Sequence, residues 1–438
     1  MYKGLGEIVN KRIYAVFLLL AVSFSIGCGK IEEVTDSVSI EEVHDSVSTE
    51  EVTDSVSDEE TNDFLEQSSV ESSVESAVFE DDEQKDEYDI MIENMTLREK
   101  VGLLFFIRPE DLCEFDAGLG PHDPTGFNDE QKKFYEEYPA GGFVLFEHNI
   151  VDEEQLNALT YALNTLPGDP LLCIDEEGGI VSRIARNKNF DVETFESMEA
   201  IALTGDTDLA YHAGDTIGNY LKKYGFDIDF APVADLNTNP KNPIIGERAF
   251  GADPYLAGEM VNAFINGLHD NGIGGCTKHF PGHGDTSTDT HTGYAKTEKT
   301  LEEIRNCELI PFKYSIDNDV DMIMVAHIST PNITGNDEPA SLSYDMITKL
   351  LREELGYDGV VITDALEMKA VSKVYSSGEA SVKAFEAGAD ILLMPVNYKE
   401  AFDAVYEAVT SGEISEERLD ESVKRILKLK VKYSAAEE

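Results

Sequence analysis

From residue 91 onward, short apolar runs alternate with stretches of helical periodicity. Between the runs, apolar residues recur every three or four positions, as at Leu256, Met260, Phe264 and Leu268. Unbroken apolar runs are typical of parallel strands buried on both faces, and their alternation with helices is typical of α/β proteins. We count eight such runs: 102–107, 142–146, 170–174, 226–230, 274–277, 322–325, 359–363 and 390–394. We therefore expect an α/β fold over residues 91–438, a single (β/α)8 TIM-like barrel; the rival arrangement is an open doubly wound sheet.

The first 28 residues have the pattern of an export signal. Lys3, Lys11 and Arg12 precede an apolar run over 13–22, which is short for a membrane span, and small residues lead to Cys28. Gly27-Cys28 resembles the lipobox of bacterial lipoproteins, which implies that Cys28 is lipidated and becomes the new amino terminus. The alternatives are an ordinary signal peptide and an uncleaved anchor. We expect a protein on the extracellular face of a bacterial membrane, attached by a lipid anchor or secreted.

Residues 29–90 are predicted to be a disordered acidic tether. A nine-residue unit begins at Glu32 and recurs at Glu41 and Glu50, and most of its residues are polar. Such units bury too little apolar surface to offset the entropy lost on ordering. The segment would hold the folded domain away from the membrane.

Composition narrows the class of protein further. There are 87 Asp and Glu against 34 Lys and Arg, for a net charge of −53, which disfavours nucleic acid as a partner. The five cysteines are Cys28, Cys113, Cys173, Cys276 and Cys307, and none lie at the short spacing of zinc or redox motifs. Nothing in the sequence implies a protein partner.

Polar residues follow several of the apolar runs directly. These positions hold Asp175, Lys278 with His279, His327 and Asp364. Active sites of barrels of this kind are built from the carboxyl ends of the strands, so we expect these side chains to converge there. A strand end reaching water is often polar without a function, which is the alternative at any single position.

The densest cluster of chemically active residues is the stretch 278–291. Three of the nine histidines fall here: His279, His283 and His291. A metal site is disfavoured, because Pro281 and neighbouring glycines prevent the helix that would present His279 and His283 side by side. The stretch is instead predicted to be a loop in which the Asp289 carboxylate orients the imidazole of His291.

These residues resemble a known family. Lys278 to Gly284 followed by Asp289-Thr290-His291 resembles the signature of the β-N-acetylhexosaminidases of glycoside hydrolase family 3. Further blocks resemble the family in its order: 95–102, 175–179 with Arg183, 231–235, 246–251 and 355–364. The resemblance spans about 92–430, and the absence of a long continuation after 431 resembles the single-domain members.

The resemblance implies a role for each matching residue. Asp364 would be the nucleophile that forms a glycosyl-enzyme intermediate, and His291 the general acid and base with Asp289 as its partner. The sugar hydroxyls would be held by Asp175, Arg183, Arg248, Lys278 and His279. The reaction implied is hydrolysis of a terminal β-linked N-acetylglucosamine from an oligosaccharide or a cell-wall fragment, with no cofactor and no metal.

The chemistry fits a retaining glycosidase, which needs a nucleophile on one face of the sugar and a proton donor on the other. Histidine populates both protonation states near neutral pH, so one residue can donate and later accept the proton. Because an imidazole does not repel phosphate, a phosphorolytic β-N-acetylglucosaminidase remains an alternative. A β-glucosidase or β-xylosidase of the same family and a non-catalytic sugar-binding lipoprotein are the others.

Two departures from the family pattern have expected consequences. Glu176 stands where the family usually has Gln, which would add negative charge near the sugar. The insertion 110–138 contains several glycines and prolines. It is predicted to be a long loop beside the first strand, either shaping a subsite for the leaving group or without a function.

Overall fold

A computed structural model of the chain describes residues 85–113, 123–286 and 295–434. The predicted signal segment with Cys28 and nearly all of the predicted tether lie outside these residues. None of the helices in the described part of the chain is both long and apolar enough to cross a membrane.

Eight parallel strands form the central sheet, as the apolar runs predict. In spatial order they are β10, β1, β2, β3, β4, β5, β7 and β9. The two ends of this order meet, because Ile362 of β9 forms a parallel bridge to Ile391, just before β10. The sheet therefore closes into a barrel, and the doubly wound alternative is wrong. The strand bounds are β1 Phe105–Ile107, β2 Gly142–Leu145, β3 Leu171–Ile174, β4 Ile228–Asp229, β5 Gly274–Phe280, β7 Met322–Val325, β9 Val360–Thr363 and β10 Leu392–Leu393.

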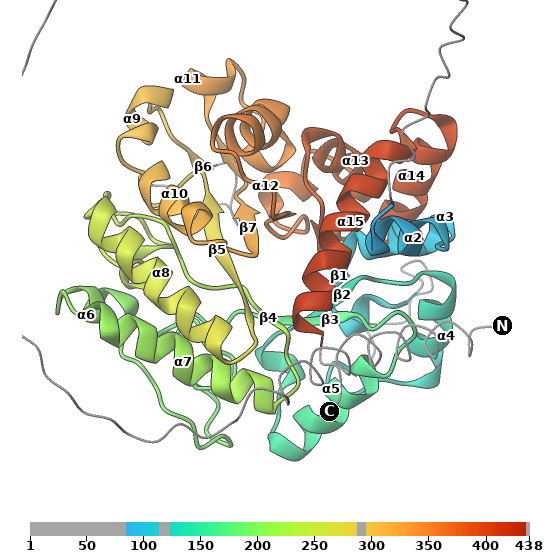
Figure 1. Cartoon of the computed structure of the whole chain (residues 1–438), viewed down its shortest axis with the longest axis horizontal. Helices are drawn as coiled ribbons and strands as arrows, with labels where there is room; N and C mark the ends of the chain where they lie inside the picture. Colours follow the sequence, from blue (N-terminus) through green and yellow to red (C-terminus); the bar gives the residue numbers. More distant parts are fainter. Residues whose placement is uncertain (1–84, 114–122, 287–294, 435–438) are drawn as a thin grey trace, which may run out of the picture. The chain divides into compact units, whose positions relative to one another are not determined.

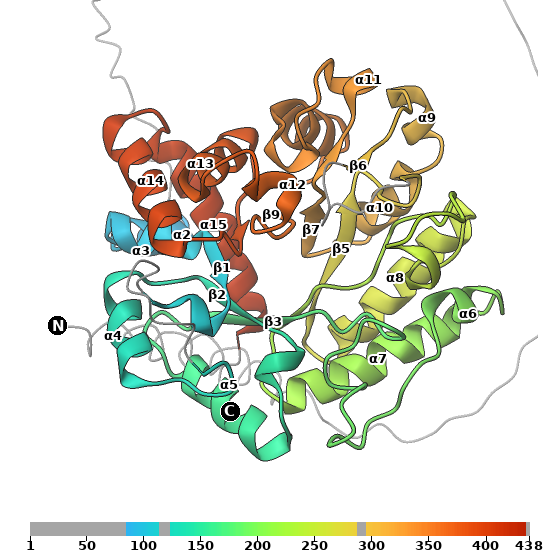
Figure 2. The ribbon, with the colours of Figure 1, turned by 180° about the vertical axis from the view of Figure 1, so that it is seen from behind.

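Helices surround these strands on the outside (Figure 1, Figure 2). Several bury an apolar face against the strands, such as α5 against β3 and α8 against β5, and α7 and α8 also pack closely against each other. The helix bounds are α2 Glu87–Glu93, α3 Leu97–Leu103, α4 Asp129–Glu137, α5 Glu153–Asn164, α6 Met198–Ala202, α7 Thr207–Lys223, α8 Pro254–Asp270, α9 Leu301–Arg305, α10 Leu309–Asp317, α11 Pro331–Thr334, α12 Lys369–Ser372, α13 Ser377–Ala387, α14 Tyr398–Ser411 and α15 Glu416–Tyr433. A π-helical segment, Asp345–Glu354, precedes β9.

Local details differ from the sequence prediction at several places. The first apolar run begins as helix, since the capping box of Thr96 and Glu99 starts α3, which extends to Leu103. The expected loop 110–138 is helical over α4, where Asn128 caps the amino end and Tyr135 is buried. A short parallel pair outside the barrel, β6 (Ala295–Lys296) with β8 (Ile328–Ser329), has no signal in the apolar pattern.

The compact unit begins at Lys85, slightly before the predicted boundary at residue 91. Asp86 caps α2 through a capping box with Asp89. Lys424 of α15 forms ion pairs of 2.7 Å with both of these carboxylates. The end of the predicted tether is therefore part of the folded domain.

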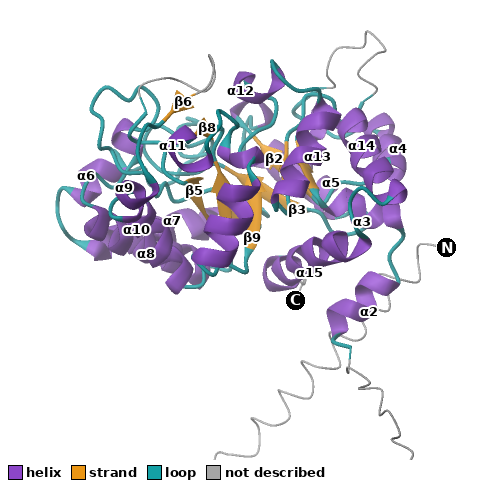
Figure 3. Cartoon of the chain, turned by 90° about the horizontal axis from the view of Figure 1, so that it is seen from above, coloured by secondary structure: helices purple, strands orange, loops and turns teal. Residues whose placement is uncertain are grey.

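The amino ends of the strands are held by buried ion pairs to α15, which lies with α2 on the side of the strands opposite β6, β8 and α12 (Figure 3). Asp390, just before β10, forms ion pairs with Arg418 and Arg425 of α15 and with Arg352 of the π-helical segment. Asp321, just before β7, pairs with His269 at 2.6 Å and with Lys432 at 2.7 Å. Polar groups at this edge stabilise the barrel, which leaves the carboxyl edge for chemistry.

Candidate active site

Four of the predicted site residues come together at the carboxyl edge of the barrel: Asp175 and Arg183 after β3, Arg248 after β4, and Lys278 in β5. Lys278, in β5, lies between two carboxylates, with its Nζ 2.6 Å from Asp175 Oδ1 and 2.6 Å from Glu177 Oε1. Its side chain is 2% exposed. Burial alone would lower the pKa of Lys278, but the two carboxylates hold it above its ordinary value.

Two arginines complete this cluster. Arg248 donates Nε and Nη2 to the two carboxylate oxygens of Glu177, both at 2.7 Å. Arg183 donates Nη2 to Asp175 at 3.3 Å, and its guanidinium lies 5.3 Å from the ring centre of Phe146. Burial raises the pKa of the Asp175 and Glu177 carboxyls, but the facing cations outweigh burial and hold both below their ordinary range.

The cluster is suited to binding a neutral polyhydroxylated ligand. It offers charged donors and acceptors at fixed positions, and charge-assisted hydrogen bonds to hydroxyls are stronger than neutral ones. Arg183 Nε is buried and has no partner among the described residues, so the cluster still has a donor to offer. Its buried charges are paired within the protein, so they remain fixed when a ligand binds.

Glu176 lies away from this cluster, contrary to the expectation that it would add charge near the sugar. Its carboxylate is fully buried and accepts the backbone N–H groups of Arg183, Ile184 and Ala185 at 2.5–3.0 Å. Tyr220 of α7 also donates its hydroxyl to Glu176 at 2.9 Å. The carboxylate therefore anchors the segment that presents Arg183.

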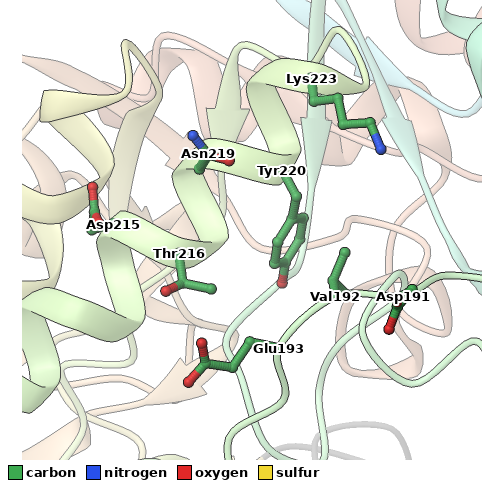
Figure 4. Close-up of a pocket in the computed structure, with 8 residues that line it drawn as sticks. All are labelled: Asp191, Val192, Glu193, Asp215, Thr216, Asn219, Tyr220 and Lys223. Carbon is green, nitrogen blue, oxygen red and sulfur yellow. The ribbon is translucent and has the colours of Figure 1, made fainter.

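Tyr220 also lines a surface hollow of about 360 Å³ between α7 and the segment 191–193 (Figure 4). None of the predicted site residues lines the hollow, and only Tyr220 connects it to Glu176. A second hollow, of about 590 Å³, is lined by Lys299 and Cys307 and likewise contains no predicted site residue.

His279 and His283 are organised by one buried carboxylate. Asp235 accepts from His279 at Nδ1 (2.6 Å) and at the backbone nitrogen (3.1 Å), and its other oxygen accepts the His283 backbone N–H at 2.5 Å. Gly284 makes this loop possible, because a Cβ there would lie 1.7 Å from the Leu236 carbonyl oxygen. Asp235 stands in one of the sequence blocks above, but the sequence alone gave it no role.

These contacts also concern the metal site at His279 and His283, which the sequence disfavours. The ring centres of His279 and His283 lie 6.1 Å apart. The Nδ1 atom of His279 is already hydrogen-bonded to the Asp235 carboxylate. Within the described ranges, no three His, Cys, Asp or Glu side chains are arranged to hold a metal ion. His283 Nε2 is buried with no partner among the described residues, and burial lowers the pKa of this imidazole.

Asp364 follows β9, at the same edge of the barrel. Its backbone N–H donates to Val325 at 2.9 Å, and its Oδ1 accepts the backbone N–H of Ala365 at 2.7 Å. Burial lowers the pKa of His283 and of His327, and the negative charge of Asp364 opposes this effect, so the carboxylate lies near these two histidines, which follow β5 and β7. A carboxylate fixed by backbone contacts in this way is suited to a nucleophile.

Asp289 and His291 lie outside the described residues, so their predicted role stays a prediction. The described residues on either side of their segment are joined by a hydrogen bond of 2.7 Å from Thr297 Oγ1 to Asp285 Oδ2.

Fold and site together define a class: a TIM-like barrel with a sugar-type binding cluster and a fixed carboxylate at its carboxyl edge. Comparison with known proteins identifies the family. The profile of the Glycosyl hydrolase family 3 N terminal domain matches residues 96–429. The chain therefore belongs to glycoside hydrolase family 3, as the sequence motifs predict.

Three relatives show what the chain is similar to. It is 34% identical to Beta-hexosaminidase A of Pseudoalteromonas piscicida, over 69% of this chain and 55% of that protein. It is 33% identical to a Beta-hexosaminidase of Pseudomonas aeruginosa, over 62% of this chain and 79% of that protein. A solved family 3 β-N-acetylglucosaminidase from Paenibacillus sp. str. FPU-7 aligns at a TM-score of 0.71 with 38% identity, over 77% of this chain and 62% of that one. The chain thus spans less than two thirds of the first relative and of this structure.

Proposed function

We propose that this protein is a retaining exo-β-N-acetylhexosaminidase that removes a terminal β-linked N-acetylglucosamine. The observation that carries the proposal is the meeting, at one barrel edge, of the paired Asp175, Arg183, Lys278 and Arg248 cluster with the fixed carboxylate of Asp364. Membership of the family and likeness to β-hexosaminidases support the substrate class. We assign cell-wall fragments or chitooligosaccharides as substrates.

In the first step, Asp364 attacks the anomeric carbon as the bond to the leaving oxygen breaks. His291 gives that oxygen its proton, and Asp289 stabilises the charge on the imidazole. In the second step, His291 takes a proton from water, water attacks the anomeric carbon, and the bond to Asp364 breaks. Two displacements return the sugar with its β configuration.

A panel of aryl glycosides that differ at the second carbon tests the activity. We expect the N-acetyl-β-glucosaminide to have the highest kcat/KM, and the β-glucoside and β-xyloside to be turned over at least about 100-fold more slowly, as when one favourable group of a substrate is lost. The assays are run with and without phosphate, and the sugar product is identified by NMR.

The results distinguish the proposed activity from the three alternatives. A preference for the glucoside would replace the proposed substrate with that of a β-glucosidase. A sugar 1-phosphate as the main product would make the enzyme a phosphorylase. Binding of N-acetylglucosamine without turnover of any substrate would support the sugar-binding lipoprotein.

We also propose that the enzyme is lipid-anchored outside the cell through Cys28. The support is the sequence of residues 1–28, with basic residues before an apolar run over 13–22 and small residues that lead to Gly27-Cys28. Cells expressing the full chain should incorporate radiolabelled fatty acid into the protein, and Cys28→Ser should abolish the label. Cys113→Ser is the matched control and should leave the label unchanged. Equal labelling of the Cys28→Ser variant would contradict the anchor.

A further inference from the structure

The backbone of Ala365, the residue after the proposed nucleophile, is held at both ends. Its N–H donates to Asp364 Oδ1 at 2.7 Å. Its carbonyl oxygen lies 2.8 Å from His327 Nε2. Because a carbonyl can only accept a hydrogen bond, the hydrogen of this bond is on His327 Nε2.

The other ring nitrogen of His327 is held as well. Nδ1 lies 2.6 Å from Ser341 Oγ, and both side chains are fully buried. Burial lowers the pKa of His327, against the charge of Asp364, so the ring is neutral with its hydrogen on Nε2. Nδ1 therefore accepts, and the Ser341 hydroxyl donates. Ser341 is itself fixed, because its backbone N–H donates to the Ala326 carbonyl at 3.1 Å.

These contacts tie the end of β9 to the end of β7. On one side of Asp364, its own N–H donates to Val325, the last residue of β7. On the other side, His327, two residues beyond β7, donates to the Ala365 carbonyl. The chain on either side of Asp364 is thus fixed to the neighbouring strand, and Oδ1 is occupied by an amide hydrogen. We assign the attack on the anomeric carbon to Oδ2.

We infer that His327 and Ser341 are positioning residues for the nucleophile. The serine hydroxyl fixes the tautomer and orientation of the imidazole, the imidazole fixes the Ala365 carbonyl, and the carboxylate of Asp364 keeps its distance to the anomeric carbon. Neither side chain is required to touch the sugar. This inference rests on the proposed function, because it concerns the geometry of its nucleophile.

Three variants of the full chain test the pair. His327→Leu removes both hydrogen bonds, Ser341→Ala removes only the one that orients the ring, and His327→Gln keeps a donor for Ala365 and an acceptor for Ser341. The readouts are kcat with an aryl N-acetyl-β-glucosaminide, the dissociation constant of N-acetylglucosamine, and the midpoint of thermal unfolding.

We expect His327→Leu to lower kcat by about 100-fold, the order of loss for a displacement of roughly 1 Å at a reacting group. Ser341→Ala should lower kcat by about 10-fold, which is a smaller share of the same effect. His327→Gln should recover most of the loss, and the affinity for N-acetylglucosamine should stay within about 2-fold of wild type, because the binding cluster on β3 and β5 is untouched.

His269→Leu is the matched control. This imidazole also bonds a buried group, the Asp321 carboxylate at 2.6 Å, but at the opposite edge of the barrel. It should lower the unfolding midpoint and leave kcat unchanged.

Several results would overturn the inference. One is an unchanged kcat in both His327→Leu and Ser341→Ala. Another is a parallel loss of kcat and of N-acetylglucosamine binding, as expected from a general loss of structure. If His327→Leu does not fold, Ser341→Ala and His327→Gln decide alone. A wild-type protein that turns over no glycoside would refute the proposed function and with it this inference, whereas an active wild type with unaffected variants refutes the inference only.

Discussion

Asp364→Ala is expected to reduce kcat for an aryl N-acetyl-β-glucosaminide by a factor on the order of 10⁴ or more, as removal of a catalytic nucleophile does in other covalent mechanisms. The physical reason is that Asp364 is the one side chain in the proposed mechanism that forms a bond to the anomeric carbon. The variant should still fold, since the bonds from the Asp364 N–H to Val325 and from His327 to the Ala365 carbonyl do not use the Asp364 side chain, and only the Ala365 N–H loses its acceptor. Stopped-assay kinetics together with the unfolding midpoint check both statements.

The matched control is Asp358→Ala, because Asp358 precedes the same strand at its amino end and is 83% exposed at its ion pair with Arg425. It should keep wild-type kcat. Added azide supplies a small nucleophile to the space left in Asp364→Ala. It should restore turnover and give the α-glycosyl azide, whereas a β-azide or undiminished activity without azide would place the nucleophile elsewhere.

The second large effect is expected from Lys278→Met. This change leaves Asp175 and Glu177 buried without the cation between them, and breaking a buried ion pair costs about 3–5 kcal/mol of the free energy of unfolding. Activity should be lost too, because Asp175, which is proposed to bind the sugar, loses the cation that fixes its carboxylate. Denaturant unfolding and the aryl glycoside assay measure the two effects.

The effect of Lys278→Met should depend on pH. In the wild-type protein the folded pKa of Asp175 and of Glu177 lies below its unfolded value, so their pairing stabilises the fold above about pH 4 and is lost as the pH falls. In the variant, the Lys278 cation no longer opposes the effect of burial, so the folded pKa values of Asp175 and Glu177 rise. The difference in stability between variant and wild type should therefore shrink as the pH falls below about 4. A difference that grows in acid would contradict this explanation.

Lys430→Met is the control for removing a buried lysine. Its Nζ donates to the Gly168 carbonyl, and burial lowers the pKa of Lys430 to about 8, so the fold already disfavours its charge. Its replacement should therefore not lower the free energy of unfolding, because it removes a charge that burial penalises. A loss equal to that of Lys278→Met would mean that the ion pairs of Lys278 are not the cause.

The barrel could be predicted from the sequence because its strands are buried on both faces and so read as unbroken apolar runs. The start of the first strand was predicted wrongly. Gly102 and Leu103 belong to an apolar run, but the capping box at Thr96 starts a helix that includes both residues. The helix at 129–137 was missed because only a few of its residues, such as Gln131 and Tyr135, are buried, so its apolar stripe is weak.

The site residues of β3 and β5 were predicted correctly as neighbours, since parallel strands end at one edge. The direction in which each side chain points was not predictable. Glu176 and Glu177 are adjacent in sequence, yet one anchors a loop and the other pairs with Arg248 and Lys278. His327 was noticed only as a polar residue after a strand; its role needs the position of Ala365, which no local pattern contains.

Trapping the covalent intermediate tests the central claim most directly. A fluorinated N-acetylglucosaminyl donor with a good leaving group slows both steps by destabilising the oxocarbenium-like transition state, and the leaving group preserves the first step. After incubation and proteolysis, mass spectrometry should find one sugar attached to the peptide that contains Asp364. A sugar on another carboxylate, or a fully processed donor with no labelled peptide, would contradict the account.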